Sequence, residues 1–263
     1  MYYNFIMQFL IITSCTRKKR VGFTSTLTAS QLNSGSHHDV ARQWIELSEI
    51  FDEKMVADHL YVGRAINEVK VASKILNAKV SFASTGFGLI DAKTKLPNYD
   101  LTVADPADPI RTKIVDEPFS PQKWWSCINQ SRNTKSLATQ LEESPHLIIL
   151  LALPKAYLHL IHHELAEISK RDVRRLRVFT SPDNVNILPE SIREAYIPYD
   201  ERFDGLESPI PGTRSDYPQR VLRHFVESII RIDSLDLDAE KERLFELLSG
   251  IVGTQLKLPE ICH

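Results

Sequence analysis

Two continuous apolar runs of strand length constrain the fold of this chain more than any other feature. Phe9–Thr13 and His146–Leu151 are apolar along almost their whole length. A strand with one solvated face alternates polar and apolar residues, so continuous runs predict strands that are covered on both faces. Three further strands are predicted at Lys79–Ser84, Leu176–Thr180 and Tyr196–Asp200.

Segments with helical periodicity separate these strands. Apolar residues spaced three and four apart predict helices at Asp39–Phe51, Arg64–Leu76, Lys155–Ser169, Tyr217–Ile232 and Ala239–Ile251. Strands that alternate with helices are typical of the α/β class, with a mostly parallel sheet flanked by helices. We expect residues 1–232 to form this α/β domain and residues 233–263 to be a C-terminal helical extension of it.

Composition excludes several classes of protein. Of the 263 residues, 43% are hydrophobic, and 32 Lys and Arg against 34 Asp and Glu give a net charge of −2. These values exclude a disordered chain and a globally cationic nucleic-acid binder, but a sum over the chain leaves local basic patches open. Cys15, Cys127 and Cys262 form no C-x-x-C pair, which argues against a disulfide framework or a thiolate zinc site and predicts a cytoplasmic protein.

The apolar N-terminus needs a separate explanation. Met1–Ile12 is too short to span a bilayer, no charge precedes it, and no small-residue cleavage site follows it. We therefore expect neither a signal peptide nor a membrane partner. Met7 is an alternative start, with Met1–Ile6 as a loose extension.

Ligands of parallel α/β sheets bind at the carboxyl ends of the strands, and the first strand is followed directly by a polar, basic loop. Ser14, Thr16, Arg17 and Lys18 offer hydroxyl groups and cations that suit a phosphate or an anionic base edge. Cys15 is a candidate catalytic nucleophile, because neighbouring cations favour the thiolate. The alternative is a small buried cysteine beside a solvated basic run.

The second predicted strand leads into a glycine-containing turn. Ser84, Gly86 and Gly88 are candidate substrate-binding residues, because glycines let a backbone approach a ligand closely. The glycines are too few for a dinucleotide fingerprint. Tyr99 could supply an aromatic face for a base, and Asp100 a general acid or base. A turn or capping role for Asp100 is the alternative.

Later basic residues are less specific. Arg214 and Arg220 lie around the start of a predicted helix, where arginines can bind phosphates, although a solvated helix face explains them as well. The basic run Arg171–Arg177 suits the end of a helix dipole. The spacing of His159, His162 and His163 could present metal ligands, but His159 and His163 point away from the buried face of their helix and no H-E-x-x-H motif is present, so we predict no metal and no cofactor.

Several short segments, taken in order, resemble the YaaA-like family. They cover most of the chain from Phe9 to Ile232, and they are Leu10–Cys15, Tyr61–Arg64, Ser84–Leu89, Pro97–Asp100, Leu153–Tyr157 and Gly212–Arg220. The family is associated with peroxide stress and DNA binding. The resemblance implies an α/β core with DNA-glycosylase-like features and an affinity for DNA, and it adds Tyr61 and Arg64 to the candidate substrate-binding residues.

The first loop resembles one subgroup in particular. Its Ser-Cys-Thr-Arg-Lys-Lys sequence is similar to proteins whose genes neighbour enzymes of 7-deazaguanine nucleic-acid modification or phage-defence genes. Cys15 stands where the peroxide-stress members have a Pro-Ala-Lys segment, so a peroxide-stress role is not expected.

The sequence thus predicts a protein of base modification or phage defence that binds DNA or a nucleobase and acts on a modified base or its glycosidic bond. Two alternatives stay open. One is a non-catalytic subunit of a defence or modification complex, with an interface formed by Ala104–Gln122, Trp124, Trp125 and the closing helix. The other is an enzyme that acts on free nucleosides or nucleotides.

Overall fold

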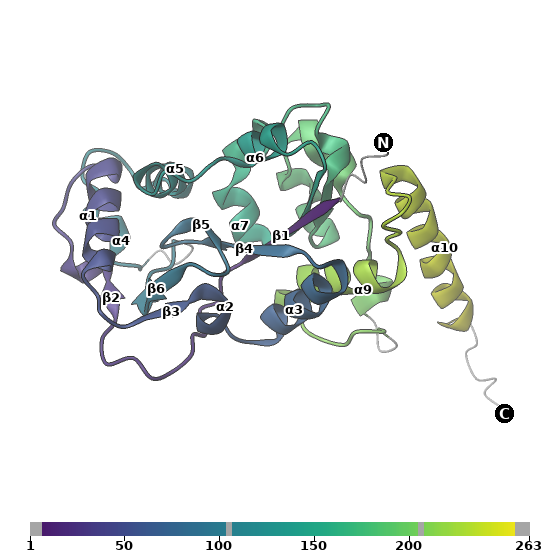
Figure 1. Ribbon diagram of the computed structural model, residues 1–263, viewed down its shortest axis with the longest axis horizontal. Coiled ribbons are helices and arrows are strands. Elements are labelled where there is room, and N and C mark those ends of the chain that lie inside the picture. Colours follow the sequence, from purple (N-terminus) through teal and green to yellow (C-terminus); the bar gives the residue numbers. More distant parts are fainter. Residues whose placement is uncertain (1–6, 104–106, 205–207, 256–263) are drawn as a thin grey trace, which may run out of the picture.

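In the computed structural model of the chain, the two continuous apolar runs lie side by side within a five-stranded sheet (Figure 1). The strand order is β5-β4-β1-β8-β9, and only β5 is antiparallel to its neighbour. The strands are β1 (Gln8–Ser14), β4 (Lys79–Ser84), β5 (Gly88–Asp91), β8 (Leu147–Ala152) and β9 (Leu176–Phe179). The chain is therefore α/β with a mostly parallel sheet.

The structure describes residues 7–103, 107–204 and 208–255, with side chains described up to residue 249. The Met1–Ile6 extension, Cys262 and residues 104–106 of the proline-rich segment lie outside this range.

Alternate residues of the central strands enter two hydrophobic cores, one on each face of the sheet. Leu10 and Ile12 of β1 belong to one core, and Phe9 and Ile11 belong to the other. This division explains the continuous apolar runs, because both sets of side chains are removed from water.

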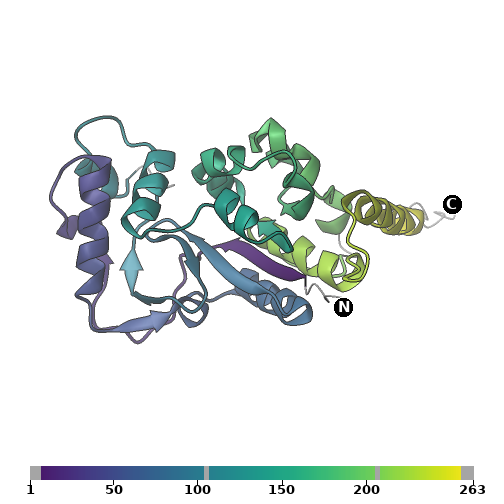
Figure 2. The ribbon, with the colours of Figure 1, turned by 45° about the horizontal axis from the view of Figure 1, so that its top comes forward.

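Different helices cover the two faces (Figures 1 and 2). The helices α3 (Arg64–Leu76) and α9 (Tyr217–Ser228) pack together and supply the core that contains Phe9. The opposite core receives residues of α1 (His37–Glu49), α5 (Pro121–Ser131), α6 (Leu137–Glu143), α7 (Lys155–Leu160) and α8 (His162–Ala166). The C-terminal helix α10 (Leu237–Gln255) contributes Leu237, Leu244 and Leu248 to the core of α3 and α9.

Short elements extend the molecule beyond the carboxyl ends of the strands. Parallel β2 (Leu27–Thr28) and β7 (Tyr99–Asp100) form one small sheet, and antiparallel β3 (Lys54–Val56) and β6 (Lys95–Pro97) form another. The short helices α2 (Ala57–Leu60) and α4 (Ile110–Lys113) lie with α1 in this part of the molecule (Figure 1).

The four predicted parallel strands are confirmed to within one or two residues at each end, and so is the helix of α3. The strand predicted at Tyr196–Asp200 is wrong, because only Tyr196 forms a bridge, to Val178. The helix predicted at Lys155–Ser169 is interrupted at Ile161, where α7 ends and α8 begins.

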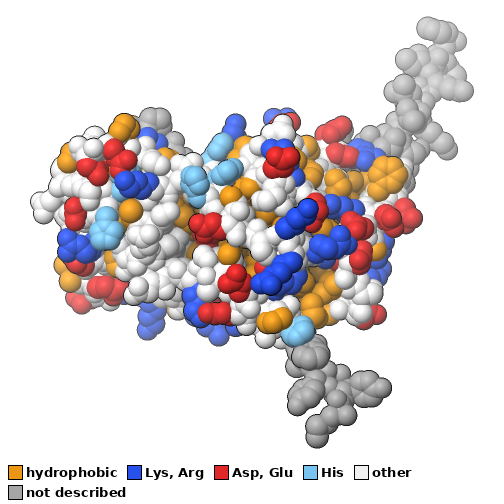
Figure 3. Space-filling model, turned by 90° about the horizontal axis from the view of Figure 1, so that it is seen from above, with side chains coloured by type: hydrophobic (Ala, Val, Ile, Leu, Met, Phe, Trp, Pro, Cys, Tyr) orange, Lys and Arg blue, Asp and Glu red, His pale blue; other side chains and the backbone are white. Residues whose placement is uncertain are grey.

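The basic run Arg171–Arg177 is largely neutralised by carboxylates. Arg174 pairs with Asp238 at 2.7 Å, and Arg175 pairs with Asp172 at 2.6 Å. Arg177 is buried and forms a bidentate ion pair with Glu240 of α10. Figure 3 shows the molecule from above, and on the half nearer α10 the Asp and Glu side chains are mixed with the Lys and Arg side chains.

None of the helices in the described part of the chain combines the length and the apolar character that crossing a bilayer requires.

Candidate active site at the carboxyl edge of the sheet

The strand order places a topological switch point between the carboxyl ends of β1 and β8. From β1 the chain crosses to β4 on one side, and it later returns to place β8 on the other side of β1. At such a switch point, the loops that follow the two neighbouring strands run in opposite directions. Ligands of open α/β sheets bind between these loops. The residues that follow β1 and β8 are therefore the first candidates for a site.

Cys15 and Tyr157 meet at this point. The Cys15 Sγ atom lies 3.0 Å from the Tyr157 hydroxyl oxygen, and the same hydroxyl lies 3.3 Å from the Cys15 carbonyl oxygen. Cys15 directly follows β1, and Tyr157 lies in the first turn of α7, directly after β8. Both side chains are half-buried.

Burial raises the pKa of Tyr157, and negative charge on Cys15 raises it further. The phenol therefore keeps its proton at neutral pH and can donate it to the sulfur. Either group can donate in the 3.0 Å contact, so the contact holds the thiol and the phenol together whichever of them supplies the proton.

Gln219 lies at the same switch point, beneath the two strand ends that it bridges. Its Nε2 atom donates to Thr13 Oγ1 at 2.9 Å and to the Ala152 carbonyl oxygen at 3.0 Å, and so it links the ends of β1 and β8. The side chain is 1% exposed, and its Oε1 atom has no hydrogen-bond partner among the described residues. Gln219 thus fixes the separation of the two strand ends that carry Cys15 and Tyr157.

A ring of three buried hydroxyl groups lies at the carboxyl end of β4. Tyr61 and Tyr99 hydroxyls are 2.8 Å apart, Tyr99 and Ser84 are 2.9 Å apart, and Tyr61 and Ser84 are 3.4 Å apart. Backbone amides of Gly86 and Phe87 also donate to Ser84 Oγ. Each hydroxyl can donate to the next one in the ring, so these groups satisfy one another.

This arrangement corrects part of the predicted binding site. The rings of Tyr61 and Tyr99 are 0% and 2% exposed, and Tyr99 packs edge-on against Phe87 and Trp44. Neither tyrosine presents a face on which a base could stack, and the Ser84 hydroxyl is also fully buried. Their contribution is to hold the neighbouring turn and loop in place.

The two glycines of the turn also serve packing. A Cβ atom at Gly86 would lie 2.9 Å from Tyr99 Cε2, and one at Gly88 would collide with the Asn129 side chain. Gly88 also has a φ of +69°, which disfavours any side chain. Protein side chains therefore fill the space beside both glycines.

Two tryptophans anchor the same turn. Trp124 Nε1 donates to the Thr85 carbonyl oxygen at 2.7 Å, and Trp44 Nε1 donates to the Gly86 carbonyl oxygen at 2.7 Å. Trp124 and Trp125 are 0% and 4% exposed. Both side chains therefore belong to the core and offer no surface to a protein partner.

The basic loop after Cys15 remains open to solvent. Arg17, Lys18 and Arg20 are exposed, whereas Lys19 is half-buried, with its Nζ atom 4.0 Å from the centroid of the Tyr99 ring. Burial lowers the pKa of Lys19, and the negative charges of Cys15 and Asp100 partly oppose that effect. Lys19 therefore lies within electrostatic range of both predicted catalytic residues.

The remaining loop residues divide between structure and solvent. Ser14 is 8% exposed, and Thr16 Oγ1 donates to the Lys18 carbonyl oxygen at 2.7 Å, which folds the loop onto itself. Asp100 is exposed and lines a pocket with Arg17 and Lys19. The hydroxyl group in contact with Cys15 Sγ is that of Tyr157, at 3.0 Å.

The predicted phosphate-binding arginines differ in their environment. Arg220 is fully buried and pairs with Asp204 and Asp216, so the prediction that it reaches a phosphate is wrong. Arg64 is 55% exposed and lies 3.6 Å from Asp216. Arg214 is exposed and forms no ion pair within the described residues.

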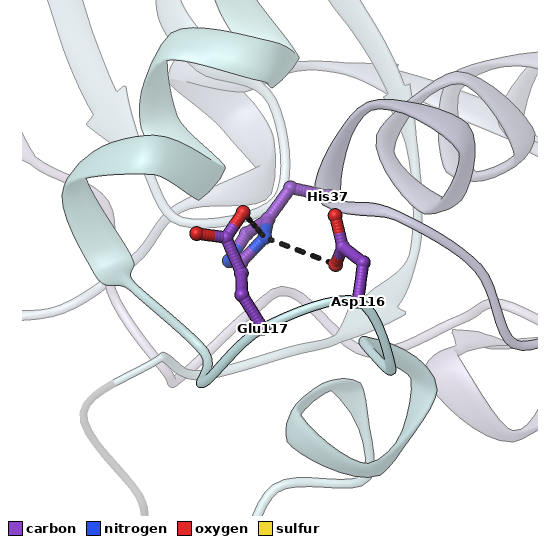
Figure 4. Close-up of side chains that lie close together, drawn as sticks. All are labelled: His37, Asp116 and Glu117. Carbon is purple, nitrogen blue, oxygen red and sulfur yellow. Dashed lines mark ion pairs between the residues drawn. The ribbon is translucent and has the colours of Figure 1, made fainter.

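His37, Asp116 and Glu117 are the side chains whose spacing best suits a metal ion (Figure 4). His37 Nδ1 lies 3.4 Å from Glu117 Oε1 and 3.8 Å from Asp116 Oδ1. However, His37 Nε2 accepts a hydrogen bond from the backbone amide of Ser120 at 3.0 Å. In a neutral ring the proton must then lie on Nδ1, which leaves that atom without a lone pair for a metal. Nδ1 lies at ion-pair distance from both carboxylates but forms no hydrogen bond among the described residues.

The structure adds Tyr157, Gln219 and Lys19 to the site. The rule that ligands bind at strand ends could have identified Tyr157, because Pro154 marks a helix start just after a parallel strand. No sequence signal distinguishes Gln219 from a surface glutamine. No protein-family model, curated protein or solved structure matches this chain.

Proposed function

We propose that this protein binds a nucleobase, free or within DNA, at the carboxyl edge of its sheet and uses the Cys15 thiol as a nucleophile on that base. The role that we assign is base modification or phage defence. The observation that carries the proposal is the Cys15–Tyr157 contact of 3.0 Å at the switch point of the sheet. The exposed cations Arg17, Lys18 and Arg20 directly beside the thiol supply the attraction for a phosphate-bearing ligand.

The contact supports a simple covalent step. The Cys15 sulfur forms a bond to an electrophilic carbon of the base, and the electron pair of the broken π bond moves to the adjacent ring or exocyclic atom. Tyr157 donates its hydroxyl proton to that atom, and the proton lost earlier by the thiol returns to the phenol through solvent. The net change is the addition of S–H across one double bond, so no further reactant is consumed.

Intact-protein mass spectrometry tests this step. We expect a mass increase equal to the base or nucleoside when the protein is incubated with 7-deazaguanine-type bases, their nucleosides, or oligonucleotides that contain them. The adduct should disappear in Cys15→Ser and form more slowly in Tyr157→Phe. Release of a free base from an oligonucleotide would place the reaction at the glycosidic bond.

Cys127→Ser is the matched control. Cys127 is a free thiol in α5 that is 6% exposed, and burial raises its pKa, so it is a poor nucleophile. Its removal should leave the adduct unchanged. Equal adduct formation in the wild type and in Cys15→Ser would contradict the proposal, and so would the absence of both adduct and binding for every base and oligonucleotide.

A further inference from the structure

We propose that the pocket between the basic loop and β7 is a phosphate-binding subsite, which holds a phosphate of the ligand whose base lies at Cys15. The inference rests on the proposed function for the position of the base, but the phosphate site itself is argued from its own residues. The pocket has a volume of about 470 Å³, and among its lining residues are Arg17, Lys19, Arg20, Tyr99 and Asp100. Its basic residues lie on the loop that joins β1 to β2, and this loop runs along the lower edge of the molecule in Figure 1.

The charges of the pocket favour an anion. Arg17, Lys19 and Arg20 contribute three positive charges, and Asp100 contributes the one carboxylate in the lining, which leaves a net of two positive charges. Arg17 and Arg20 form no ion pair within the described part of the chain. A concave surface with an excess of cations concentrates anionic ligands.

Several other arginines of this chain are paired with carboxylates. Arg174 pairs with Asp238, Arg202 with Asp200, and Arg220 with Asp204 and Asp216. Four consecutive basic residues beside a pocket with a single carboxylate depart from that arrangement. A phosphate would supply the negative charge that protein groups supply elsewhere.

Lys19 gives this pocket a fixed cation. The backbone of the loop is held by a hydrogen bond from the Arg20 amide to the Leu60 carbonyl oxygen at 2.9 Å, and residues 19 and 61 form a β-bridge. The Lys19 ammonium group lies over the aromatic ring of Tyr99. The Tyr99 hydroxyl is in turn held by hydrogen bonds with the hydroxyls of Tyr61 and Ser84. A half-buried cation without a carboxylate in hydrogen-bond contact gains most from an incoming anion.

The position of Lys19 also places the phosphate near the reacting base. Lys19 lines the pocket on one side and lies within electrostatic range of Cys15 on the other. A nucleotide that bridges the two would place its base at the thiol and its phosphate against Arg17 and Arg20. Phosphate groups of a mononucleotide and of a nucleic-acid strand share this chemistry.

Titration calorimetry with three probes tests the subsite. The probes are inorganic phosphate, guanosine monophosphate and a single-stranded oligonucleotide of about ten residues. Arg17→Ala/Arg20→Ala should weaken binding of the phosphate-bearing probes by about tenfold or more, because each arginine that is removed would donate charge-assisted hydrogen bonds to the phosphate. For the oligonucleotide, the slope of log affinity against log salt should fall by about 0.7 for each arginine–phosphate pair that the substitutions remove.

The matched control is Arg171→Ala/Arg174→Ala, which removes the same two charges from exposed arginines that pair with Asp172 and Asp238. It should leave affinity and salt slope nearly unchanged. Strong binding of guanosine monophosphate would identify a nucleotide as the source of the phosphate, and binding of the oligonucleotide alone would identify a strand. Equal losses of affinity in both double variants, or no loss in Arg17→Ala/Arg20→Ala, would overturn the subsite.

The outcome is separable from that of the proposed function. Cys15→Ser should abolish the covalent adduct and leave phosphate binding intact, whereas Lys19→Met should weaken phosphate binding and retain the apolar stem over Tyr99. Nucleosides without phosphate should bind the wild type and Arg17→Ala/Arg20→Ala equally. If phosphate binds as expected but no base reacts, only the proposed function fails.

Discussion

The buried ion pair between Arg177 of β9 and Glu240 of α10 makes a strong prediction about the C-terminal helix. The two side chains are 1% and 0% exposed, and Arg177 Nη2 donates to Glu240 Oε1 at 3.1 Å while Nε donates to Oε2. Arg177 Nη1 also donates to the carbonyl oxygens of Arg174 and Leu176. Glu240→Gln keeps the shape of the side chain but removes the charge that compensates a buried guanidinium.

The expected loss of stability follows from this geometry. Removal of one partner from a buried, hydrogen-bonded pair costs about 3–5 kcal/mol, because the other charge stays buried without compensation. For a chain of this size, each 1 kcal/mol lowers the melting temperature by about 2–4 °C. Glu240→Gln should therefore melt roughly 6–20 °C below the wild type. Arg177→Met/Glu240→Leu removes both charges and should lose much less.

Thermal unfolding followed by circular dichroism measures these differences. Arg174→Ala is the control, because it breaks an exposed ion pair with Asp238 of the same helix. Its melting temperature should equal that of the wild type. If Glu240→Gln melts within about 2 °C of the wild type, α10 is not held by this ion pair. If the double variant is as unstable as Glu240→Gln, the loss comes from packing rather than from an uncompensated charge.

Three further predictions concern the other core and the turn beside Cys15. Burial lowers the pKa of His37 below its ordinary value of 6.5, so its neutral form stabilises the fold above pH 6.5 and that contribution is lost as the pH falls. Urea unfolding between pH 7 and 5 should therefore show a smaller change of unfolding free energy with pH in His37→Gln than in the wild type. The exposed control His38→Gln should show the same change as the wild type. Gly86→Ala should cost about 1–3 kcal/mol, because its Cβ would press on Tyr99; urea unfolding like that of the wild type would refute the close contact. Tyr99→Phe should also cost about 1–3 kcal/mol in the same assay, since it breaks the buried hydroxyl ring; a stabilised variant would show that the ring is not needed.

The sequence predicted the sheet well because its signal is local. Continuous apolar runs such as Phe9–Thr13 report burial on both faces, and each run carries that information by itself. The antiparallel edge strand β5 could not be predicted in this way. It depends on the positive φ of Gly88 and on Asn129, whose Oδ1 accepts a hydrogen bond from the Leu89 amide across forty positions.

The site was predicted only in part for a similar reason. Proximity to a strand end placed Cys15 and the basic loop at the carboxyl edge of the sheet, but it could not show which polar groups satisfy one another. Tyr61, Tyr99 and Ser84 use their hydroxyls on each other, and Arg220 uses its guanidinium on two carboxylates. These pairings join residues far apart in the chain, so residue type alone does not separate a ligand-binding group from a structural one.

Lys19 lines the pocket beside β7 and also lies within electrostatic range of Cys15, so its charge should affect the reactivity of the thiol. Burial lowers the pKa of the Lys19 ammonium and negative charge on Cys15 partly opposes that effect, so the two groups lie within electrostatic range of each other. Lys19→Met removes the ammonium charge and leaves Tyr157 in contact with the thiol. We expect iodoacetamide to alkylate Cys15 more slowly in Lys19→Met than in the wild type at pH 7, as followed by mass spectrometry of the modified peptide.

The strength of this effect depends on salt and on occupancy of the pocket. Lys19 is half-buried, so the difference between Lys19→Met and the wild type should persist at 0.5 M salt, whereas any effect of the exposed Lys18→Met should be screened. Inorganic phosphate, if it binds beside Lys19, should slow alkylation of the wild type, because it adds negative charge near the thiolate, and should have little effect on Lys19→Met. Equal alkylation rates in the wild type and Lys19→Met would show that the thiol takes its reactivity from Tyr157 alone, and that the pocket and the nucleophile act independently.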